Sequence, residues 1–362
     1  MKSLVLTFSK REIYQAIQIT LAWTFIGIIA ILYDYSLSFT PYVRFEGVSL
    51  KEMLFAQITT SIVSSFITGL IIVKFFIPWI RSRPYGKALL MTWLTYTLLS
   101  FLTATIALSF FYPYKLGIPY FSLALLQEIV GFIFGPEFIR YYFLWLFILM
   151  TTMIALLVND KYGPGIFKDF LLGKYFQPRR TERIFMFLDL RGSTRIAEQL
   201  GEVKYFSFLK DAFLDVTPAI IYSGGEIYQY VGDEIVVSWK VEKGVKQAQC
   251  LKSFVRLQED LKQKSEYYQK VYGVIPEFKA GLHAGFVIAG EIGAIKREIT
   301  FSGDVLNTSS RIQGKCNELG VKILFSQELC VMLNSATHNL TFKEMGEVEL
   351  SGKKKKILLY TV

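Results

Sequence analysis

Four long apolar segments occupy most of the first 158 residues, and they restrict how this half of the chain can fold. They are Tyr14–Leu32, Phe55–Val73, Ala88–Phe111 and Tyr141–Val158. Each is close to the ~20 residues that a helix needs to cross a bilayer. Because none of them contains Asp or Glu, an ion or proton pathway is not indicated. We expect a bundle of four transmembrane helices over residues 1–158.

Basic residues around these segments predict their orientation, because Lys and Arg concentrate on the cytoplasmic side of membrane helices. They flank the first segment, fill the loop after the second and follow the fourth: Lys2, Lys10, Arg11, Arg81, Arg83, Lys87, Lys161, Lys168 and Lys174. With four crossings, both termini and the second half of the chain are cytoplasmic. The pattern therefore predicts a multi-pass protein of the cell (inner) membrane.

A further apolar stretch, Pro119–Phe134, is interrupted by Gln127, Glu128 and Gly131. We expect it to form an interfacial or re-entrant helix on the outer side of the membrane. The membrane half is either a plain anchor or a sensor for a lipid or small ligand, and no residue pattern selects between these two roles.

The linker and the overall charge narrow the functional classes. Residues 159–180 carry two prolines and several basic residues, and this stretch is too short for a coiled-coil stalk. The net charge is +10, but the sequence contains no nucleic-acid-binding module. Membrane edges and a triphosphate site both account for excess positive charge, so we expect no nucleic-acid partner. The three cysteines lack metal-ligand spacing and are interpreted as reduced thiols.

The second half is organised around the stretch Ile184–Thr194. Its apolar residues predict a buried strand that ends at Asp189, after which Gly192 turns the chain into a helix. The amides of Gly192, Ser193 and Thr194 then point out of the helix start, where they favour a phosphate group. A carboxylate beside a free helix N-terminus can hold a divalent cation and a polyphosphate together.

A second stretch, Tyr228–Glu234, repeats the pattern of strand, glycine turn and exposed carboxylate. A hairpin that turns at Gly232 and Asp233 would bring Asp233 to the same sheet edge as Asp189. The two carboxylates are then close enough to share two cations. Either aspartate taken alone is more often a turn or helix-cap residue, but together they favour metal binding.

Hydrophobic periodicity predicts the other elements of residues 181–362. They are a long helix after Asp189 with Ile196, Leu200, Phe206, Leu209 and Phe213 on its buried face, a second long helix over Val245–Tyr272, and short strands at Phe278–His283 and Val287–Ala289. The order strand, helix, hairpin, helix, strand is that of a ferredoxin-like α+β sandwich.

A third stretch, Glu298–Arg311, predicts a strand carrying Thr300 that leads into a helix. Asn307 and Arg311 are four residues apart, so they share one helical face. An amide and a guanidinium on one face can hold a sugar and a phosphate. Taken alone, Arg311 is more often a residue that makes a surface ion pair.

Together these stretches resemble the class III nucleotidyl cyclases, the catalytic domain of adenylate and guanylate cyclases. The resemblance covers about half of the chain, from Thr181 to Val362. It rests on Phe-Leu-Asp-Leu-Arg-Gly-Ser-Thr (187–194), Gly-Gly-Glu-Ile-Tyr-Gln-Tyr-Val-Gly-Asp-Glu (224–234), Gly-Leu-His-Ala-Gly (281–285) and Phe-Ser-Gly-Asp-Val-Leu-Asn-Thr-Ser-Ser-Arg (301–311).

The resemblance implies roles for these residues. Asp189, Asp233 and the backbone carbonyl of Leu190 would bind two Mg²⁺ or Mn²⁺ ions. Asn307 would orient the ribose, and Arg311 would stabilise the pentacovalent phosphorus. The resemblance also implies a head-to-tail homodimer, in which one protomer supplies the metals and the other supplies the base, ribose and transition-state contacts.

The chain departs from the family's usual pattern in the base pocket and near its C-terminus. Adenylate cyclases usually carry Lys where this chain has Gln229, and Asp, or Thr in one subgroup, where it has Thr300. Guanylate cyclases usually carry Glu and Cys at these two places. Thr300 favours adenine, whereas the Gln229 amide suits either base. Ser351 replaces a lysine that contacts phosphate, and Lys353 is a candidate substitute for it.

The sequence therefore predicts a membrane-bound adenylate cyclase that converts ATP to 3′,5′-cyclic AMP and pyrophosphate. A guanylate cyclase differs only in the base pocket and stays an alternative. A nucleotide-binding sensor that keeps the cyclase fold without turnover is a second alternative, which Gln229 and Ser351 motivate.

Overall fold

The computed structural model describes residues 8, 10–37, 50–77, 79, 83–162, 173–295, 297–336, 342–349 and 356–362. Ser351 and Lys353 lie outside these described residues. Internal contacts divide the chain into two compact units, Met1–Val158 and Asn159–Val362. Each unit has hydrophobic clusters of its own and is described by itself.

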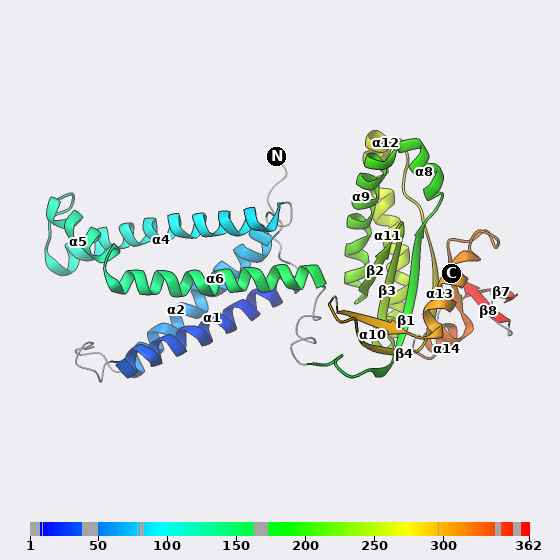
Figure 1. The fold of residues 1–362 in the computed structure, drawn as a ribbon, viewed down its shortest axis with the longest axis horizontal. Helices are drawn as coiled ribbons and strands as arrows, with labels where there is room; N and C mark the ends of the chain where they lie inside the picture. The colour runs from blue at the N-terminus through cyan, green and yellow to red at the C-terminus, as the bar shows by residue number, and fades with distance from the viewer. Residues whose placement is uncertain are drawn as a thin grey trace. The chain divides into compact units, whose positions relative to one another are not determined.

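The described part of the N-terminal unit is helical (Figure 1). They are α1 (Lys10–Leu37), α2 (Leu50–Ile71), the π-helical turn η1 (Ile72–Phe76), α4 (Tyr85–Leu116), α5 (Leu123–Ile133) and α6 (Pro136–Tyr162).

Within the described residues, three helical spans are long and apolar enough to cross a membrane. They are Glu12–Tyr33, Tyr85–Tyr114 and Phe138–Val158, and they contain the first, third and fourth predicted segments. The second predicted segment, Phe55–Val73, lies in α2 and η1. There the described residues contain a shorter apolar helix, Ser61–Phe76.

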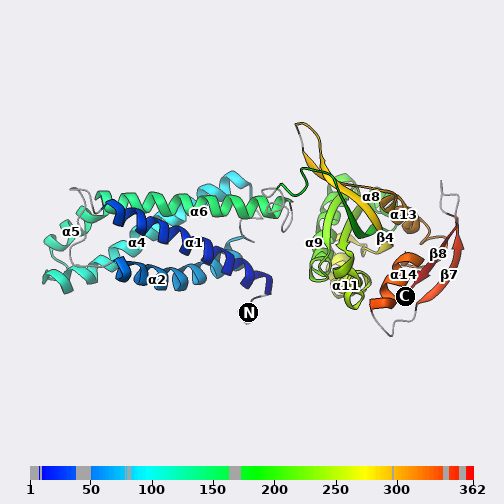
Figure 2. The same cartoon turned by 90° about the horizontal axis from the view of Figure 1, so that it is seen from below.

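Helices α1 and α2 lie side by side and pack closely through small residues (Figures 1 and 2). A Cβ added at Gly69 would lie 3.3 Å from backbone atoms of Ala16, and Ala16 is itself fully buried. Small residues let helix backbones approach each other inside a membrane, where hydrophobic burial between helices supplies little driving force. A second contact joins α1 to α6, because the Trp23 Nε1–H donates to Thr152 Oγ1 at 3.0 Å.

The predicted stretch Pro119–Phe134 contains the short helix α5. Ser122 caps this helix, since its Oγ accepts a hydrogen bond from the Leu125 amide at 3.1 Å. Leu125, Ile129 and Ile133 are buried on one side of α5, in a cluster that includes residues of α4. One side of α5 therefore packs on α4, and the interfacial or re-entrant placement stays a prediction.

The C-terminal unit is built on an eight-stranded sheet in the order β2-β3-β1-β4-β6-β8-β7, with β5 paired to β4. Its strands are β1 (Arg179–Leu190), β2 (Glu226–Val231), β3 (Glu234–Lys240), β4 (Phe278–Ile292), β5 (Glu298–Ser302), β6 (Ile323–Ser326), β7 (Lys343–Val348) and β8 (Ile357–Thr361). Strands β4 and β6 run parallel. The two short strands predicted after residue 277 are parts of the single strand β4.

Helices cover both faces of this sheet (Figure 1). They are α8 (Ser193–Leu200), α9 (Glu202–Tyr222), α10 (Val241–Val245), the 3₁₀ turn η2 (Lys246–Ala248), α11 (Gln249–Gln263), α12 (Ser265–Tyr272), α13 (Asp304–Gly314) and α14 (Gln327–Ala336). Helices α9 and α11 pack on the face that carries Ile184 and Met186. Helix α13 packs on the opposite face, which carries Phe185. Because side chains alternate along a strand, Asp189 falls on the α13 face. The fold is α+β as predicted, with more strands than the predicted ferredoxin-like order.

The two long helices predicted in this unit are both interrupted. The first breaks at Gly201, whose φ of 73° separates α8 from α9. The buried face of α9 carries Phe208, Ala212 and Val216, and Phe206 is 72% exposed instead of buried. The second breaks at Gln247 and Ala248, which also have positive φ, and again between α11 and α12.

Gly281 on β4 determines how closely α13 can approach the sheet. A Cβ added there would lie 2.2 Å from the Gln313 backbone nitrogen and 2.5 Å from the Ser309 carbonyl oxygen. The Ser309 hydroxyl also donates to the Phe185 carbonyl oxygen at 3.3 Å. The backbone of α13 therefore rests directly on β4 and is tied to β1.

We predict that Gly281→Ala destabilises the C-terminal unit by roughly 1–3 kcal/mol, because the added methyl group must push α13 away from β4. The matched control is Gly314→Ala at the end of α13, where an added Cβ meets nothing within 4 Å. That control should be neutral or stabilising by up to ~1 kcal/mol, since Ala favours helix over Gly. Thermal unfolding of the two variants and the wild type tests this, and equal melting temperatures for both variants would contradict it.

Candidate active site

The Asp189 carboxylate lies at the end of β1, where two neighbouring elements hold it. Lys279 Nζ on β4 is 3.1 Å from Asp189 Oδ2. Gln313 Nε2 on α13 donates to the same oxygen at 2.8 Å. The side chain of Asp189 is 22% exposed, and its Oδ1 makes no hydrogen bond or ion pair in the part of the chain that the structure describes. One oxygen of this carboxylate is therefore available to a ligand.

Two further carboxyl groups lie beside Asp189. The β2–β3 hairpin turns at Gly232, whose φ of 61° is one that glycine adopts without strain. The register of β1 and β3 then pairs Glu234 with Asp189, and Asp233 is the residue before it.

The three carboxyl groups affect one another electrostatically. Burial raises the pKa of Asp189, and the charge of Asp233 raises it further, against the lowering effect of Lys279. Burial and the charges of Asp189 and Asp233 raise the pKa of Glu234 to about 7. A carboxylate whose charge is disfavoured by burial and by a neighbouring acid is stabilised by a cation placed beside it.

This set of oxygen donors suits a hard divalent cation, because Mg²⁺ and Mn²⁺ bind carboxylate and carbonyl oxygens. The Lys279 ammonium already places a positive charge beside Asp189. Among the described residues, no group of three or more Asp, Glu, His or Cys side chains is arranged to hold a metal ion. A cation held by Asp189 and Asp233 would therefore need further oxygens from the backbone, water or a bound ligand. Leu190, the predicted carbonyl donor, directly follows Asp189 and is buried.

The N-terminus of α8 follows Asp189 directly. Gly192 precedes the helix with φ 70°, and Ser193 begins it, as the sequence predicts. The first amides of a helix have no carbonyl partner within that helix, so those of Ser193 and Thr194 favour an anion. Burial and the Asp233 charge raise the pKa of the Tyr205 hydroxyl on α9, while a hydrogen bond with Ser193 lowers it. Tyr205 thus belongs to the same cluster.

Asn307 and Arg311 lie on a different face of α13 from Gln313. They are about 120° and about 160° around the helix axis from Gln313, and Gln313 is the residue that reaches Asp189. Asn307 is exposed and Arg311 is half-buried. Arg311 makes no ion pair with any described residue. The structure therefore does not bring these two residues together with Asp189 within one chain.

Gln229 and Thr300 lie on two strands that a tyrosine connects. Gln229 is exposed on β2, beside an irregularity in the β2–β3 register, and Thr300 pairs with Gly290 on β4. The Tyr228 hydroxyl accepts a hydrogen bond from the Phe301 amide at 3.3 Å, and the two rings lie 5.1 Å apart. Gln229 directly follows Tyr228, and Thr300 directly precedes Phe301. Each of the two predicted base-contacting residues is therefore a chain neighbour of a residue that joins β2 to β5.

Sequence reasoning misses four residues of this site: Glu234, Tyr205, Lys279 and Gln313. The alternation of Lys279 with buried Phe278 and Ala280 is a local signal that its side chain faces away from those two. Its contact with Asp189 depends on the β1–β4 register, which no local pattern reveals. Gln313 contacts Asp189 only because α13 packs on the sheet at Gly281.

Comparisons with known proteins match the C-terminal unit. The model of the protein family described as "Adenylate and Guanylate cyclase catalytic domain" matches residues 177–362, just over half of the chain. Adenylate cyclase 2 of Rhizobium meliloti (strain 1021) is 32% identical over 210 residues, which cover 58% of this chain and 58% of that protein. The adenylate cyclase of Anabaena cylindrica is 28% identical over 184 residues, which cover 49% of this chain and 36% of that protein.

A solved structure of a bacterial light-regulated adenylyl cyclase shows the same fold. It has a TM-score of 0.50 at 22% sequence identity, with 60% of this chain and 63% of that chain covered. The chain thus spans less than two thirds of the length of each of these three relatives.

We predict that Glu234 makes the metal-free protein less stable as the pH rises from 4.5 to about 7. A carboxyl group whose pKa is raised by folding favours the folded state most when it is protonated, and that contribution is lost as it ionises. From pH 4.5 to about 7, Glu234→Gln should therefore become increasingly more stable than the wild type. Above about pH 7 the difference in stability should stay constant. Thermal unfolding in EDTA at several pH values measures this difference.

The matched control is Glu259→Gln on the exposed side of α11, which makes the same change of residue type away from the site and is measured under the same conditions. A Glu234→Gln difference that is independent of pH would contradict the prediction.

Proposed function

The chain belongs to the adenylate and guanylate cyclase catalytic domain family, and from this we propose that it is a membrane-bound adenylate cyclase. It converts ATP to 3′,5′-cyclic AMP and pyrophosphate by attack of the ribose 3′-oxygen on the α-phosphate. The observation that supports this best is the group of carboxylates formed by Asp189, Asp233 and Glu234 beside the N-terminus of α8. Two relatives of this chain, from Rhizobium meliloti and Anabaena cylindrica, are named adenylate cyclases.

Asp189 and Asp233, with the Leu190 carbonyl, hold two Mg²⁺ or Mn²⁺ ions in this proposal. Bound there, such ions lower the pKa of a hydroxyl group and offset negative charge on phosphate. The triphosphate itself supplies the further oxygens that the two carboxylates require. Lys279, which pairs with Asp189, is free to pair with the triphosphate once a cation replaces it at the carboxylate. The amides of Gly192, Ser193 and Thr194 bind a phosphate group at the start of α8.

Asn307 and Arg311 act on the substrate of a second protomer. In one chain they face away from Asp189, and Arg311 has no carboxylate partner among the described residues. In a head-to-tail homodimer, the Asn307 amide orients the ribose, and the Arg311 guanidinium neutralises the charge that develops at the α-phosphate. An unpaired guanidinium on a half-buried helix face supports this assignment, because it is available to an incoming anion.

Gln229 and Thr300 contact the base, with Lys353 as a further phosphate contact outside the described residues. The Thr300 hydroxyl and the Gln229 amide both donate and accept hydrogen bonds, and Thr300 favours adenine. Cyclic-nucleotide formation from ATP and from GTP, measured with Mn²⁺ on the full-length protein, tests this assignment. Faster turnover of GTP would make the protein a guanylate cyclase, and binding without any cyclic product would make it a nucleotide sensor.

Residues 1–158 form the membrane domain in this proposal, residues 159–180 the linker and residues 181–362 the catalytic domain. Four crossings place both termini and the catalytic domain in the cytoplasm. The basic residues around the apolar segments support this orientation. The three long apolar spans support membrane crossing, and four crossings require that the shorter apolar helix Ser61–Phe76 also crosses.

We predict that Asp189→Ala, Asp233→Ala and Arg311→Ala each reduce turnover about 10²-fold or more, because each removes a group that stabilises charge in the transition state. Coexpressed Asp189→Ala and Arg311→Ala chains should recover activity, since a mixed dimer keeps one intact site. Random pairing of the two chains limits the recovery to about a quarter of the wild-type rate.

The matched control is coexpression of Asp189→Ala with Asp233→Ala, which should stay inactive because both changes damage the same half of every site. Asp260→Asn on α11, outside the site, should keep wild-type turnover. Equal activity of the two coexpressed pairs would contradict the composite site.

A further inference from the structure

Arg183 is a buried cation on β1, with 3% of its side chain exposed. Its Nη1 donates to Glu226 Oε2 on β2 at 2.5 Å and to Ser238 Oγ on β3 at 3.1 Å. Strand β3 lies between β1 and β2 in the sheet. The guanidinium therefore reaches past β3 and binds the edge strand β2 to β1.

The pairing of this arginine is incomplete. Its Nε is buried and has no hydrogen-bond partner among the described residues. Glu226 keeps 39% of its side chain exposed, so water weakens the attraction between the two charges. A buried charge that is only partly hydrogen-bonded costs stability, and an apolar side chain of similar size would pack at least as well. Packing alone therefore does not account for a charge at this position.

An aromatic cluster connects the same guanidinium to β5. The Arg183 Cζ lies 4.8 Å from the centre of the Phe301 ring, within the range of cation–π contacts. Phe301 also meets Phe185 edge to face at 5.5 Å, and its amide donates to the Tyr228 hydroxyl. One side chain on β1 thus contacts β2 through Glu226 and β5 through Phe301.

Strand β2 has a bulge just before Gln229. The register against β3 shifts there, and Tyr228 is the residue without a partner on β3. Such a bulge changes the direction in which neighbouring side chains project. The bond between Arg183 and Glu226 fixes β2 before the bulge, and the contact of Tyr228 with β5 fixes the bulge itself. These contacts therefore determine where Gln229 lies relative to Thr300 on β5.

We propose that Arg183, bound to Glu226, is a positioning residue for recognition of the nucleotide base. It fixes β2 relative to β5, so that the Gln229 amide and the Thr300 hydroxyl bond to one base at the same time. Without it, each residue moves with its own strand, and the site discriminates less between adenine and guanine. The inference rests on the proposed function, from which it takes the two base contacts.

The test measures kcat/KM for ATP and for GTP with Mn²⁺ on the full-length protein and compares their ratio. Arg183→Met keeps a long side chain and removes the donors. We expect it to reduce the preference for one base several-fold to about tenfold, the loss that accompanies one or two misplaced hydrogen bonds. A variant that only folds less well loses activity with both nucleotides in proportion, which leaves the ratio unchanged.

Substitutions of Glu226 test the hydrogen bond itself. Glu226→Gln keeps an oxygen that accepts from Arg183, so it should retain the wild-type ratio. Glu226→Leu removes the acceptor and should reduce the preference as Arg183→Met does. The matched control is Arg256→Met on α11, which removes another guanidinium stacked on a ring, 4.2 Å from the centre of that of Tyr222. It lies outside the site and should keep the wild-type ratio, and thermal unfolding checks that all variants fold.

Binding measurements separate this inference from the proposed function. The probes are 3′-deoxy-ATP and 3′-deoxy-GTP, which lack the attacking hydroxyl group, and equilibrium dialysis with Mn²⁺ gives their dissociation constants. A wild type that forms no cyclic product would overturn the proposed function, whereas a binding preference that falls in Arg183→Met would still support the inference. An unchanged preference in Arg183→Met, equal binding of both probes by the wild type, or the same loss in Glu226→Gln as in Glu226→Leu would overturn the inference and leave the cyclase activity standing.

Discussion

The catalytic unit depends on one partly buried carboxylate, that of Asp189, and on what surrounds it. Burial and the neighbouring acid Asp233 destabilise its charge, while Lys279 and Gln313 stabilise it. The balance is achieved by elements far apart in sequence, β1, β3, β4 and α13. Among the described residues, three acids lie together here and one ammonium, that of Lys279, pairs with Asp189, so a divalent cation would stabilise the site. Without a metal, the Lys279 ammonium offsets the negative charge of the Asp189 carboxylate. A cation that binds Asp189 would have to displace this ammonium.

Helix α13 links the two halves of the proposed chemistry. Its position is set by Gly281, because any side chain on that residue would meet the helix backbone. The face of α13 toward the sheet carries Gln313 to Asp189 of its own chain. The outer face carries Asn307 and Arg311, which lie away from Asp189 of the same chain. In the proposed enzyme, one helix therefore holds a residue that contacts Asp189 of its own chain and two residues assigned to the site of another protomer, so a shift of α13 would alter both.

The sequence predicts those parts of the site that depend on local pattern. The run of apolar residues before Asp189, the glycine after it and the helix start at Ser193 are all adjacent in the chain, and the structure has them as predicted. The hairpin turn at Gly232 is local in the same sense. Glu234 and Lys279 are different, because their proximity to Asp189 comes from strand pairing. Pairing registers are set by the packing of whole strands, which a single sequence does not display.

The wrong helix predictions have a similar origin. The prediction continues one helix through Gly201 and places Phe206 on its buried face. Leu200 and Phe206 are six residues apart, about 120° around a helix, so the apolar residues before and after Gly201 do not share one face. In the structure α9 begins after Gly201 and buries Phe208, Ala212 and Val216, while Phe206 is exposed. Periodicity over Val245–Tyr272 likewise cannot reveal that Gln247 and Ala248 adopt positive φ, which non-glycine residues rarely do.

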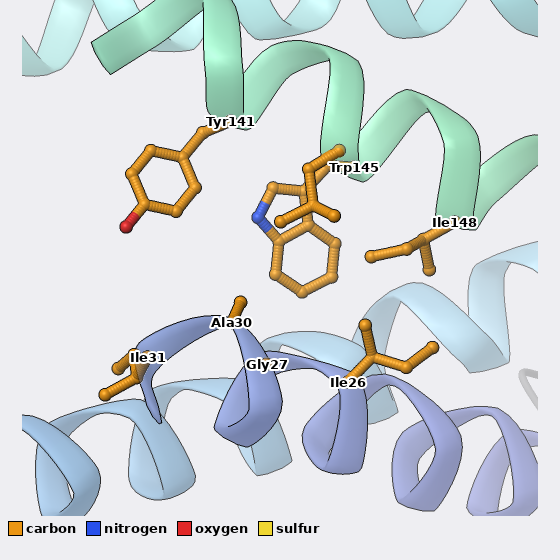
Figure 3. Close-up of a pocket in the computed structure, with 8 residues that line it drawn as sticks. Ile26, Gly27, Ala30, Ile31, Tyr141, Trp145 and Ile148 are labelled. Carbon is orange, nitrogen blue, oxygen red and sulfur yellow. The ribbon is translucent and has the colours of Figure 1, made fainter. Parts of the chain in front are cut away.

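The membrane half shows why composition does not distinguish an anchor from a sensor. Threonine and serine are tolerated in membrane helices because their hydroxyl groups bond to the preceding turn, so their presence in α4 predicts nothing by itself. Thr92, Ser100 and Thr103 line an open groove of this unit, and each donates to a backbone carbonyl of its own helix. The pocket between α1 and α6 beside Trp145 (Figure 3) has a volume of about 150 Å³, below the roughly 300–1,000 Å³ of pockets that bind small molecules. Hydroxyl groups in a plain membrane anchor make the same bonds, so these residues do not select between the two roles.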